Sequence, residues 1–244
     1  MQEVFIVSMA RTPIGALSGV LGGVNVIELG KTVVKAAMER AGVNGDQIDE
    51  VYIGNVLQAN VGQAPAQQVS IAAGINTKTP CTTINKVCAS GMKAIMLGAQ
   101  SIMLGDNHVV VVGGMESMTN SPHYLPSGRS GIRYGNGEIL DAISRDGLQD
   151  PYKKYMMGSA GEVCAKHYAF TREDQDAYAI ASYKRAQEAY ANGYFKDEIV
   201  PVVIASKKGD VSVTEDEEYK KFDESKVSAL KPAFEKDGTI TAIN

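Results

Sequence analysis

The feature that most constrains the fold is an alternation of strand-like and helix-like segments along the first 118 residues. Runs rich in β-branched and apolar residues, typical of strands, occupy residues 3–8, 51–58, 80–85 and 108–117. Segments with apolar residues at helical spacing lie between them, at residues 26–42, 63–74 and 90–106. The last strand, HVVVVGGMES, is continuously apolar, as expected at the centre of a parallel sheet. This alternation predicts a wound α/β layer.

The character of the sequence changes after residue 118. Residues 119–156 contain three prolines, several glycines and little periodicity, and an irregular segment of this length is typical of a lid or an oligomer contact. The remaining chain predicts two helices, the second capped by Thr171, and then a hairpin that turns at Lys208–Gly209: residues 157–168, 171–192, 199–206 and 210–216. We therefore divide the chain into residues 1–118 and residues 119–244.

The predicted helix at residues 90–106 is apolar nearly all round, which indicates burial on most sides. Such a helix needs a second layer to cover it, and nothing after residue 118 obviously supplies one. The sequence therefore reads as one unit of a larger fold. In the alternative, residues 157–192 fold back over the sheet as the cover.

Composition and charge narrow the functional classes. The net charge is −4 and the pI about 5.5, so there is no global basic field to attract nucleic acid or acidic membranes. We find no signal peptide at the N-terminus and no apolar run near the roughly 18 residues that a membrane span needs. Three cysteines without zinc-site spacing indicate reduced thiols in a cytoplasm, and Cys164 with His167 supplies only two ligands, too few for a metal site.

Cys88 stands where the third predicted strand passes into the apolar helix. A helix N-terminus stabilises a thiolate, and its N–H groups can hold an oxyanion. The small residues 89–91 would let a substrate approach the sulfur, so the position suits a nucleophile. A small core filler is the alternative, because free cysteine is among the most buried residue types. No partner base is evident, since His108, His123 and His167 all read as ordinary histidines.

Seven blocks of the sequence resemble the thiolase family, in the family's order and over essentially the whole chain. The block around Cys88 resembles the acyl-enzyme signature, and the short-chain type that handles acetoacetyl-CoA is the most similar. The blocks are ARTPIGALSGVL, GNVLQANVGQAPAQQVSIAAG, INKVCASGMKAI, VVVVGGMESMTNSPHYLP, MMGSAGEVCAKH, TREDQDAYAIASYKRAQEA and LKPAFEKDGTITAIN.

The resemblance implies a layered mixed sheet with helices on both faces, one of two similar family halves, plus an irregular α/β loop domain. It implies condensation of two acetyl-CoA to acetoacetyl-CoA, or the reverse thiolysis, through an acylated Cys88 whose own N–H contributes to an oxyanion hole. CoA thioesters would be substrates, with no other cofactor. Residues 119–244 would cover the CoA and build a homotetramer. Positions that match the CoA pocket are Leu148, Met157, Lys220 or Lys221, and Phe234.

The sequence also departs from the family pattern. The family's second half carries an asparagine, the activating histidine, a second cysteine and an oxyanion-hole glycine, and none has a counterpart here. Met156 replaces a histidine, and the lysine pair replaces an arginine that lysine does not fully mimic. We therefore expect a homo-oligomer or a second chain that carries the other half. The alternatives are a non-catalytic remnant that binds CoA or a partner chain, and a ketosynthase-like or HMG-CoA-synthase-like condensing enzyme.

Overall fold

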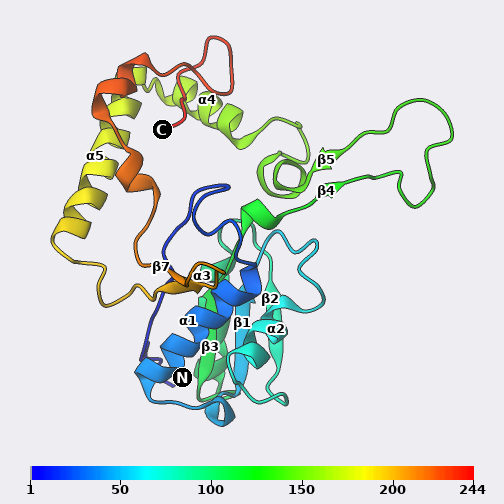
Figure 1. Cartoon of the computed structure of the whole chain (residues 1–244), viewed down its shortest axis with the longest axis vertical. Coiled ribbons are helices and arrows are strands. Elements are labelled where there is room, and N and C mark those ends of the chain that lie inside the picture. Colours follow the sequence, from blue (N-terminus) through cyan, green and yellow to red (C-terminus); the bar gives the residue numbers. More distant parts are fainter. Residues whose placement is uncertain (1) are drawn as a thin grey trace.

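The computed structural model describes residues 2–244 as two lobes (Figure 1). One lobe contains the parallel sheet and helices α1 to α3, and the other is built on α4 and α5. The α-helices are α1 Val26–Ala41, α2 Pro65–Ala72, α3 Ser90–Leu104, α4 Met157–Tyr168 and α5 Arg172–Ala191. Short 3-10 helices lie at Gly45–Gln47, Met118–Asn120, Glu218–Lys221 and Glu224–Ala229, and a π-helix lies at Ile143–Leu148. The strands are β1 Glu50–Gly54, β2 Cys81–Ile84, β3 Val110–Gly114, β4 His123–Tyr124, β5 Leu140–Asp141, β6 Val202–Ile204 and β7 Val211–Val213.

The main sheet has three parallel strands in the order β2-β1-β3. Val51 of β1 pairs with Cys81 of β2 on one side and with Val111 of β3 on the other. Three of the four predicted strands and all three predicted helices of this lobe are present. The parallel α/β layer predicted from the alternation is therefore confirmed.

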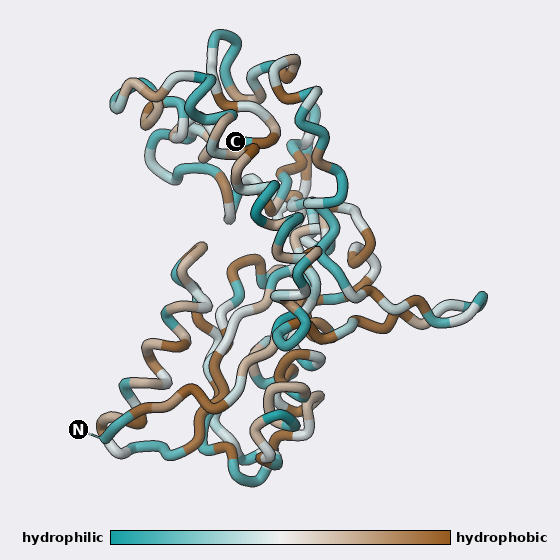
Figure 2. The backbone as a smooth tube through the Cα atoms, turned by 90° about the vertical axis from the view of Figure 1, so that its left-hand side faces the viewer, coloured by the Kyte–Doolittle hydropathy of each residue, from teal (hydrophilic) through white to brown (hydrophobic). Residues whose placement is uncertain are grey.

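The strand predicted at residues 3–8 is wrong in the described structure. The segment lies beside β3, and both line a cavity of about 360 Å³, but no ladder forms between their backbones within the described residues. Phe5, Ile6 and Val7 are 71%, 80% and 74% exposed, and the hydrophobic colouring of this segment is visible near the N-terminus in Figure 2. As a result β3 is an edge strand, and β1 takes the central place that the sequence predicted for β3.

Side chains alternate between the two faces of β1. Val51 and Ile53 join the hydrophobic core that α1 and α2 form on one face. Gly54 faces the other way and meets the first turn of α3. Asn25 caps the N-terminus of α1, and Gly42, in the left-handed region, ends this helix. The helices thus cover both faces of the sheet, as predicted.

Helix α3 is buried on only one side. Ala94 and Gly98 are buried against the sheet, whereas Met92, Ile95 and Met96 on its outer side are 68%, 46% and 48% exposed. The prediction of burial on most sides is therefore wrong for the described residues. Residues Val87–Leu104 are also long and apolar enough to cross a membrane by length and composition, contrary to the sequence expectation, although core helices meet the same criterion.

The chain after the arm-like irregular segment confirms the predicted helix pair and the predicted hairpin, and the hairpin lies beside the sheet lobe (Figure 1). Thr171 and Asp174 form a reciprocal cap at the start of α5, and β6 pairs antiparallel with β7. Glu162 of α4 is buried and accepts hydrogen bonds from the N–H groups of Thr239 and Ile240 at 2.8 and 2.7 Å. Figures 1 and 2 show α4 and α5 away from the sheet, so the alternative in which residues 157–192 cover it is wrong.

Arg11 joins the two parts of the chain. Its guanidinium bonds Glu198 at 2.6 Å and Asp216 at 2.8 Å and stacks over the Phe195 ring. The Asp216 carboxylate also accepts from the N–H of Ile14 at 2.7 Å. The loop after the N-terminal segment is therefore tied to residues on both sides of the β6–β7 hairpin.

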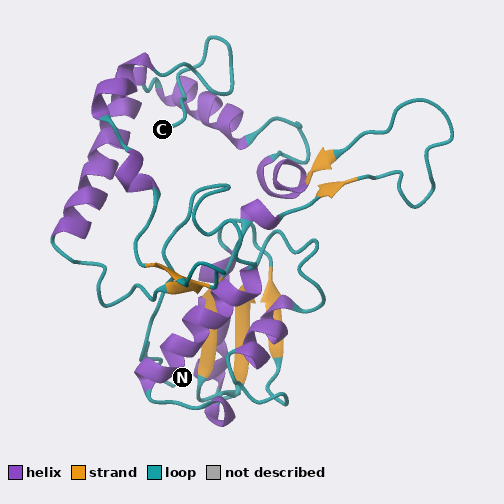
Figure 3. Cartoon of the chain, viewed as in Figure 1, coloured by secondary structure: helices purple, strands orange, loops and turns teal. Residues whose placement is uncertain are grey.

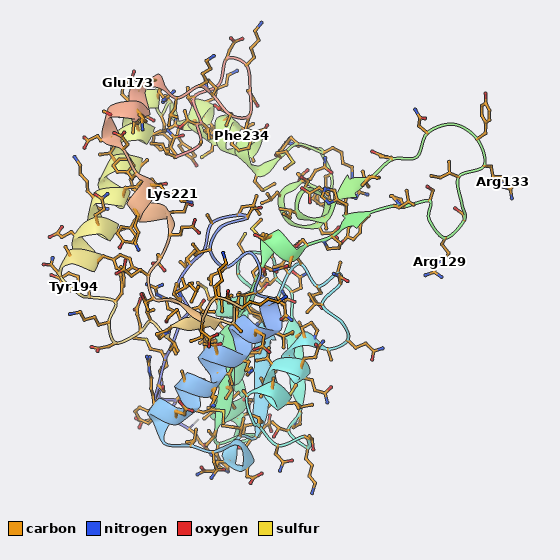
Figure 4. All side chains as sticks on the ribbon, in the orientation of Figure 1. Arg129, Arg133, Glu173, Tyr194, Lys221 and Phe234 are labelled. Carbon is orange, nitrogen blue, oxygen red and sulfur yellow. The ribbon has the colours of Figure 1, made fainter. Side chains whose placement is uncertain are left out.

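An arm extends from the molecule between β4 and β5 (Figure 3). The two strands are two residues long each, and the chain between them forms no helix or strand. The side chains of Arg129 and Arg133 project from the arm (Figure 4). The irregular character predicted for residues 119–156 is thus largely confirmed.

Candidate active site

Cys88 lies on the turn that leads from β2 into α3, where its side chain is exposed. It precedes the helix by two residues, at the strand-to-helix junction that the sequence predicted. Val87 before it has a φ of +48°, unusual for a β-branched residue. Ser90 holds the turn, because its hydroxyl donates to Val87 O at 2.6 Å and accepts from Lys86 N at 2.8 Å. The filler alternative fails, since a core filler would be buried.

Backbone donors are available at this turn. The N–H groups of Ala89 and Ser90 donate to Lys86 O and Val87 O. The N–H of Cys88 has no hydrogen-bond acceptor within residues 2–244. A free N–H beside the sulfur can stabilise negative charge that develops on an oxygen bound there.

Three glycines bring the start of α3 directly against the ends of two strands. A Cβ on Gly54 would stand 2.6 Å from the Ser90 carbonyl carbon, and one on Gly114 would stand 3.2 Å from the Gly91 Cα. Any side chain at Gly54 would force the helix away from the sheet. The glycines therefore set how closely the start of α3 approaches the sheet, and with it the position of the Cys88 sulfur.

A cavity of about 410 Å³ opens beside Cys88. Its walls come from the ends of β1 and β3, from the Cys88 turn and from residues 147–148, and most are apolar. Among the predicted CoA-pocket residues, Leu148 is the one that lines this cavity. The titratable side chains that line it are Cys88 and Glu116.

Sequence reasoning missed the Asn55–Glu116 pair in this cavity wall. Asn55 is fully buried and its amide donates to Glu116 Oε1 at 2.9 Å. The other carboxylate oxygen, Oε2, accepts from Val56 N at 2.9 Å. Asn55 directly follows the apolar strand β1 and Glu116 comes two residues after the apolar strand β3, and polar residues close behind two apolar strands are a signal that could have found them. The pair ties the ends of β1 and β3 together below the cysteine.

The other predicted CoA-pocket residues lie in the second lobe, and the structure does not bring them to the Cys88 cavity. Met157 and Phe234 are 46% and 47% exposed, and the Phe234 ring packs over Gly158, next to Met157. Lys220 pairs with Glu215 at 2.6 Å. Figure 4 labels Phe234 and Lys221 in this lobe.

None of the three histidines lines the cavity. His123 lies in β4, and His167 packs edge-on against Tyr168 at a centroid distance of 4.7 Å. Within residues 2–244, no three potential metal ligands form a group. Cys88 therefore lies in a cavity whose one other ionisable side chain, among the described residues, is the carboxylate of Glu116.

Comparison with known proteins gives consistent matches. The family described as "Thiolase, N-terminal domain" matches residues 4–244. A cytosolic acetyl-CoA acetyltransferase of Gibberella zeae is 50% identical over 99% of this chain and 61% of its own length. A mitochondrial acetyl-CoA acetyltransferase of Xenopus laevis is 51% identical over 100% of this chain and 58% of its own length.

A solved structure is also similar. The Acat5 thiolase from Ascaris suum, crystallised in complex with coenzyme A, superposes with a TM-score of 0.92 at 46% identity. The match covers 99% of this chain and 62% of that one. The chain thus spans about 60% of the length of the relatives it matches. The fold, the order of the seven blocks and the family match agree, and the chain belongs to the thiolase family, of which it contains the N-terminal domain.

Proposed function

We propose that Cys88 accepts an acetyl group from acetyl-CoA, in a reversible condensation of two acetyl-CoA to acetoacetyl-CoA. The observation that supports this most is the exposed sulfur of Cys88 on a fixed turn, at the mouth of a cavity and beside an unoccupied N–H. Relatives about 50% identical are named acetyl-CoA acetyltransferases. Both point to acyl transfer through a thioester.

The acylation step follows from the geometry of the turn. The Cys88 thiolate attacks the thioester carbonyl, the carbonyl π electrons move to its oxygen, and the Cys88 N–H stabilises that oxyanion. Collapse of the intermediate expels the CoA thiolate, which takes up a proton, and leaves acetyl-Cys88. A second acetyl-CoA, deprotonated at its methyl carbon, then attacks this thioester and releases Cys88.

The proton transfers need a base, and the described chain offers only Glu116 at the cavity. We propose that further groups come from a complementary polypeptide segment, in this chain's oligomer or in a second chain. Activity would then depend on assembly. Mixing the chain with a polypeptide that carries the rest of a relative, and assaying acetoacetyl-CoA thiolysis before and after mixing, tests this dependence.

We propose that CoA extends from the cavity to the second lobe. Leu148 would contact the end of the pantetheine near the sulfur, and Met157 and Phe234 would flank the part farther out. Lys220 would contact a phosphate, after exchanging its ion pair with Glu215 for the ligand. An exposed lysine makes a weaker, less directional phosphate contact than arginine.

Single-turnover acetylation tests the proposed nucleophile. Incubation with acetyl-CoA should add one acetyl group, located on Cys88 by mass spectrometry of peptides. Cys88→Ser should remove that signal, whereas Cys164→Ser, at another exposed cysteine, should retain it. Acetylation at Cys164 alone, or equal acetylation of Cys88→Ser, would contradict the proposal.

We propose that the arm between β4 and β5 mediates self-association. Ile132, Tyr134 and Ile139 are 46%, 100% and 69% exposed on it, and exposed apolar side chains on a projecting loop favour a protein contact. Sedimentation velocity of the chain and of a Tyr134→Ser variant tests this. A homo-oligomer that is unaffected by the substitution would contradict it.

We propose a cytosolic location, since relatives are found in both cytosolic and mitochondrial forms and an exposed thiol persists best in a reducing compartment. Imaging of a tagged full-length gene product tests it.

A further inference from the structure

A second cavity lies directly behind the wall of the Cys88 cavity. It has a volume of about 280 Å³ and lies beneath the loop of residues 12–21. Apolar side chains dominate its lining, among them Ile14, Leu17, Leu21 and Leu29. The space is therefore suited to an alkyl chain.

Two residues line both cavities: Glu116 and Met118. They form the partition between the space beside Cys88 and the space beneath residues 12–21. No other residue belongs to both walls among the described residues. The two cavities would become one if this partition were thinner.

The backbone of the partition is held in place on both sides of Met118. Glu116 accepts hydrogen bonds from Val56 N and from the Asn55 amide. Thr119 accepts from Ser18 N at 2.9 Å, and the Asn120 amide donates to Val24 O at 2.9 Å. The partition therefore keeps its backbone position when the side chain between these anchors changes.

The Met118 side chain itself has no polar anchor and is 38% exposed. Methionine is unbranched and flexible, so it adapts its shape to the space around it. Glu116, in contrast, is fixed by its hydrogen bonds. Met118 is accordingly the adjustable part of the partition.

We infer that Met118 limits the length of the acyl chain that Cys88 accepts. This inference rests on the proposed acylation of Cys88 and specifies which acyl groups that step accepts. Short acyl groups fit in the Cys88 cavity, whereas longer straight chains also need the cavity beneath residues 12–21. Replacing Met118 by alanine opens that space. Each methylene buried there favours binding by roughly fourfold, the ratio that follows from the transfer of a CH₂ group out of water.

A chemical probe tests the partition without requiring enzyme turnover. Methyl and hexyl methanethiosulfonate convert the Cys88 thiolate into a mixed disulfide and release methanesulfinate. The experiment uses the full chain with Cys164→Ser, and peptide mapping locates the label. The measured quantity is the melting temperature of the hexyl-labelled protein minus that of the methyl-labelled protein.

In the Met118→Ala variant this difference should exceed that of the parent by about 3 °C or more, because the tail becomes buried. Met118→Phe should give a difference no larger than the parent's. Met103→Ala is the matched control, since Met103 is 39% exposed, close to Met118, and lines neither cavity. An equal difference in Met118→Ala, Met103→Ala and the parent would overturn the inference.

If Met118→Ala does not fold, Met118→Val, which keeps an apolar but shorter side chain, takes its place with the same expected sign. Transfer from acyl-CoA then links the partition to function: the ratio of hexanoyl to acetyl transfer onto Cys88 should rise by about tenfold or more in the variant, since burial of two methylenes already gives about sixteenfold. An unchanged ratio would overturn the inference. If acetyl-CoA leaves Cys88 of the parent unmodified, the proposed function fails. The comparison of methyl-labelled and hexyl-labelled protein still decides whether Met118 forms the partition between the two cavities.

Discussion

Gly54, the last residue of β1, lies so close to Gly91 in α3 that a Cβ on Gly54 would stand 2.7 Å from the Gly91 nitrogen. Because the obstacle is backbone, the helix itself must move to accept a side chain. The pair therefore couples the end of a central strand to the turn that carries Cys88.

We expect Gly54→Ala to lower the free energy of unfolding by about 1–3 kcal/mol, as overpacking does, and to slow alkylation of Cys88 by iodoacetamide. Gly113→Ala is the control, because Gly113 lies in β3 and a Cβ there meets no atom within 4 Å. Urea unfolding and mass spectrometry give the two readouts. Equal effects of the two substitutions would argue against the coupling.

The backbone at Val87 is expected to be strained. Its φ of +48° costs an L residue about 1–2 kcal/mol, whereas glycine adopts it freely but loses about 0.5–1 kcal/mol in chain entropy. Val87→Gly should therefore raise the free energy of unfolding by about 0.5 kcal/mol. Val111→Gly, in the extended strand β3, should lower it. A loss of stability in Val87→Gly as large as in Val111→Gly would show that the turn is not strained.

Stability should fall in acid through the junction at Arg11. Burial opposes ionisation of Asp216, but hydrogen bonds from Arg11 and Ile14 N outweigh it and lower the pKa of this carboxyl. Hydrogen bonds from Lys221 and from the N–H groups of Ala16 and Val20 lower the pKa of Glu217 to about 2. For carboxyls with a depressed pKa in the folded state, the stabilisation is present above the ordinary value and is lost as pH falls through the folded value.

The loss is expected between about pH 4.5, the ordinary value for Glu217, and about pH 2. Asp216→Asn should flatten this part of the stability curve, measured by urea unfolding at successive pH values. Asp210→Asn, at an exposed carboxylate that forms no ion pair within the described residues, should leave it unchanged. If the free energy of unfolding falls with pH in the same way for Asp216→Asn and the parent, Asp216 does not contribute to this loss of stability in acid.

Gly158 gives a test of the proposed CoA path. An added Cβ would stand 2.3 Å from the Phe234 ring, so Gly158→Ala must displace that ring. We expect CoA binding, measured by calorimetry, to weaken about tenfold, equivalent to the loss of about 1.4 kcal/mol. Gly23→Ala, where a Cβ meets no atom within 4 Å, is the control. Unchanged affinity in Gly158→Ala would remove Phe234 from the proposed path.

The sequence predicted the elements whose causes are local. Periodicity located α1, and periodicity with the Thr171 cap located α5, and these signals act within a few residues. The position of Cys88 between a strand and a helix was also predicted, whereas its exposure decided between two interpretations that the sequence left open. The predicted strand at residues 3–8 failed because strand formation depends on a distant partner, which local composition does not encode.

The cavity walls were less predictable for the same reason. Leu148 reaches the Cys88 cavity, whereas Met157 and Phe234 do not, and only the path of the chain between them decides this. Asn55 and Glu116 are 61 positions apart in sequence and meet through the register of β1 and β3. The resemblance indicated which single positions match the CoA pocket of the family, and the tertiary structure decided which of them line the same cavity.

The extended segment at residues 3–8 has a consequence for biosynthesis. It is synthesised before β3, the strand beside it, which is made about 100 residues later. At roughly 5–20 residues per second, this leaves an apolar stretch without its neighbour for about 5–20 seconds. During that interval the apolar side chains of Phe5, Ile6 and Val7 are exposed surface of the kind that promotes aggregation, so the yield of folded protein should depend on conditions during synthesis as well as on the stability of the finished fold.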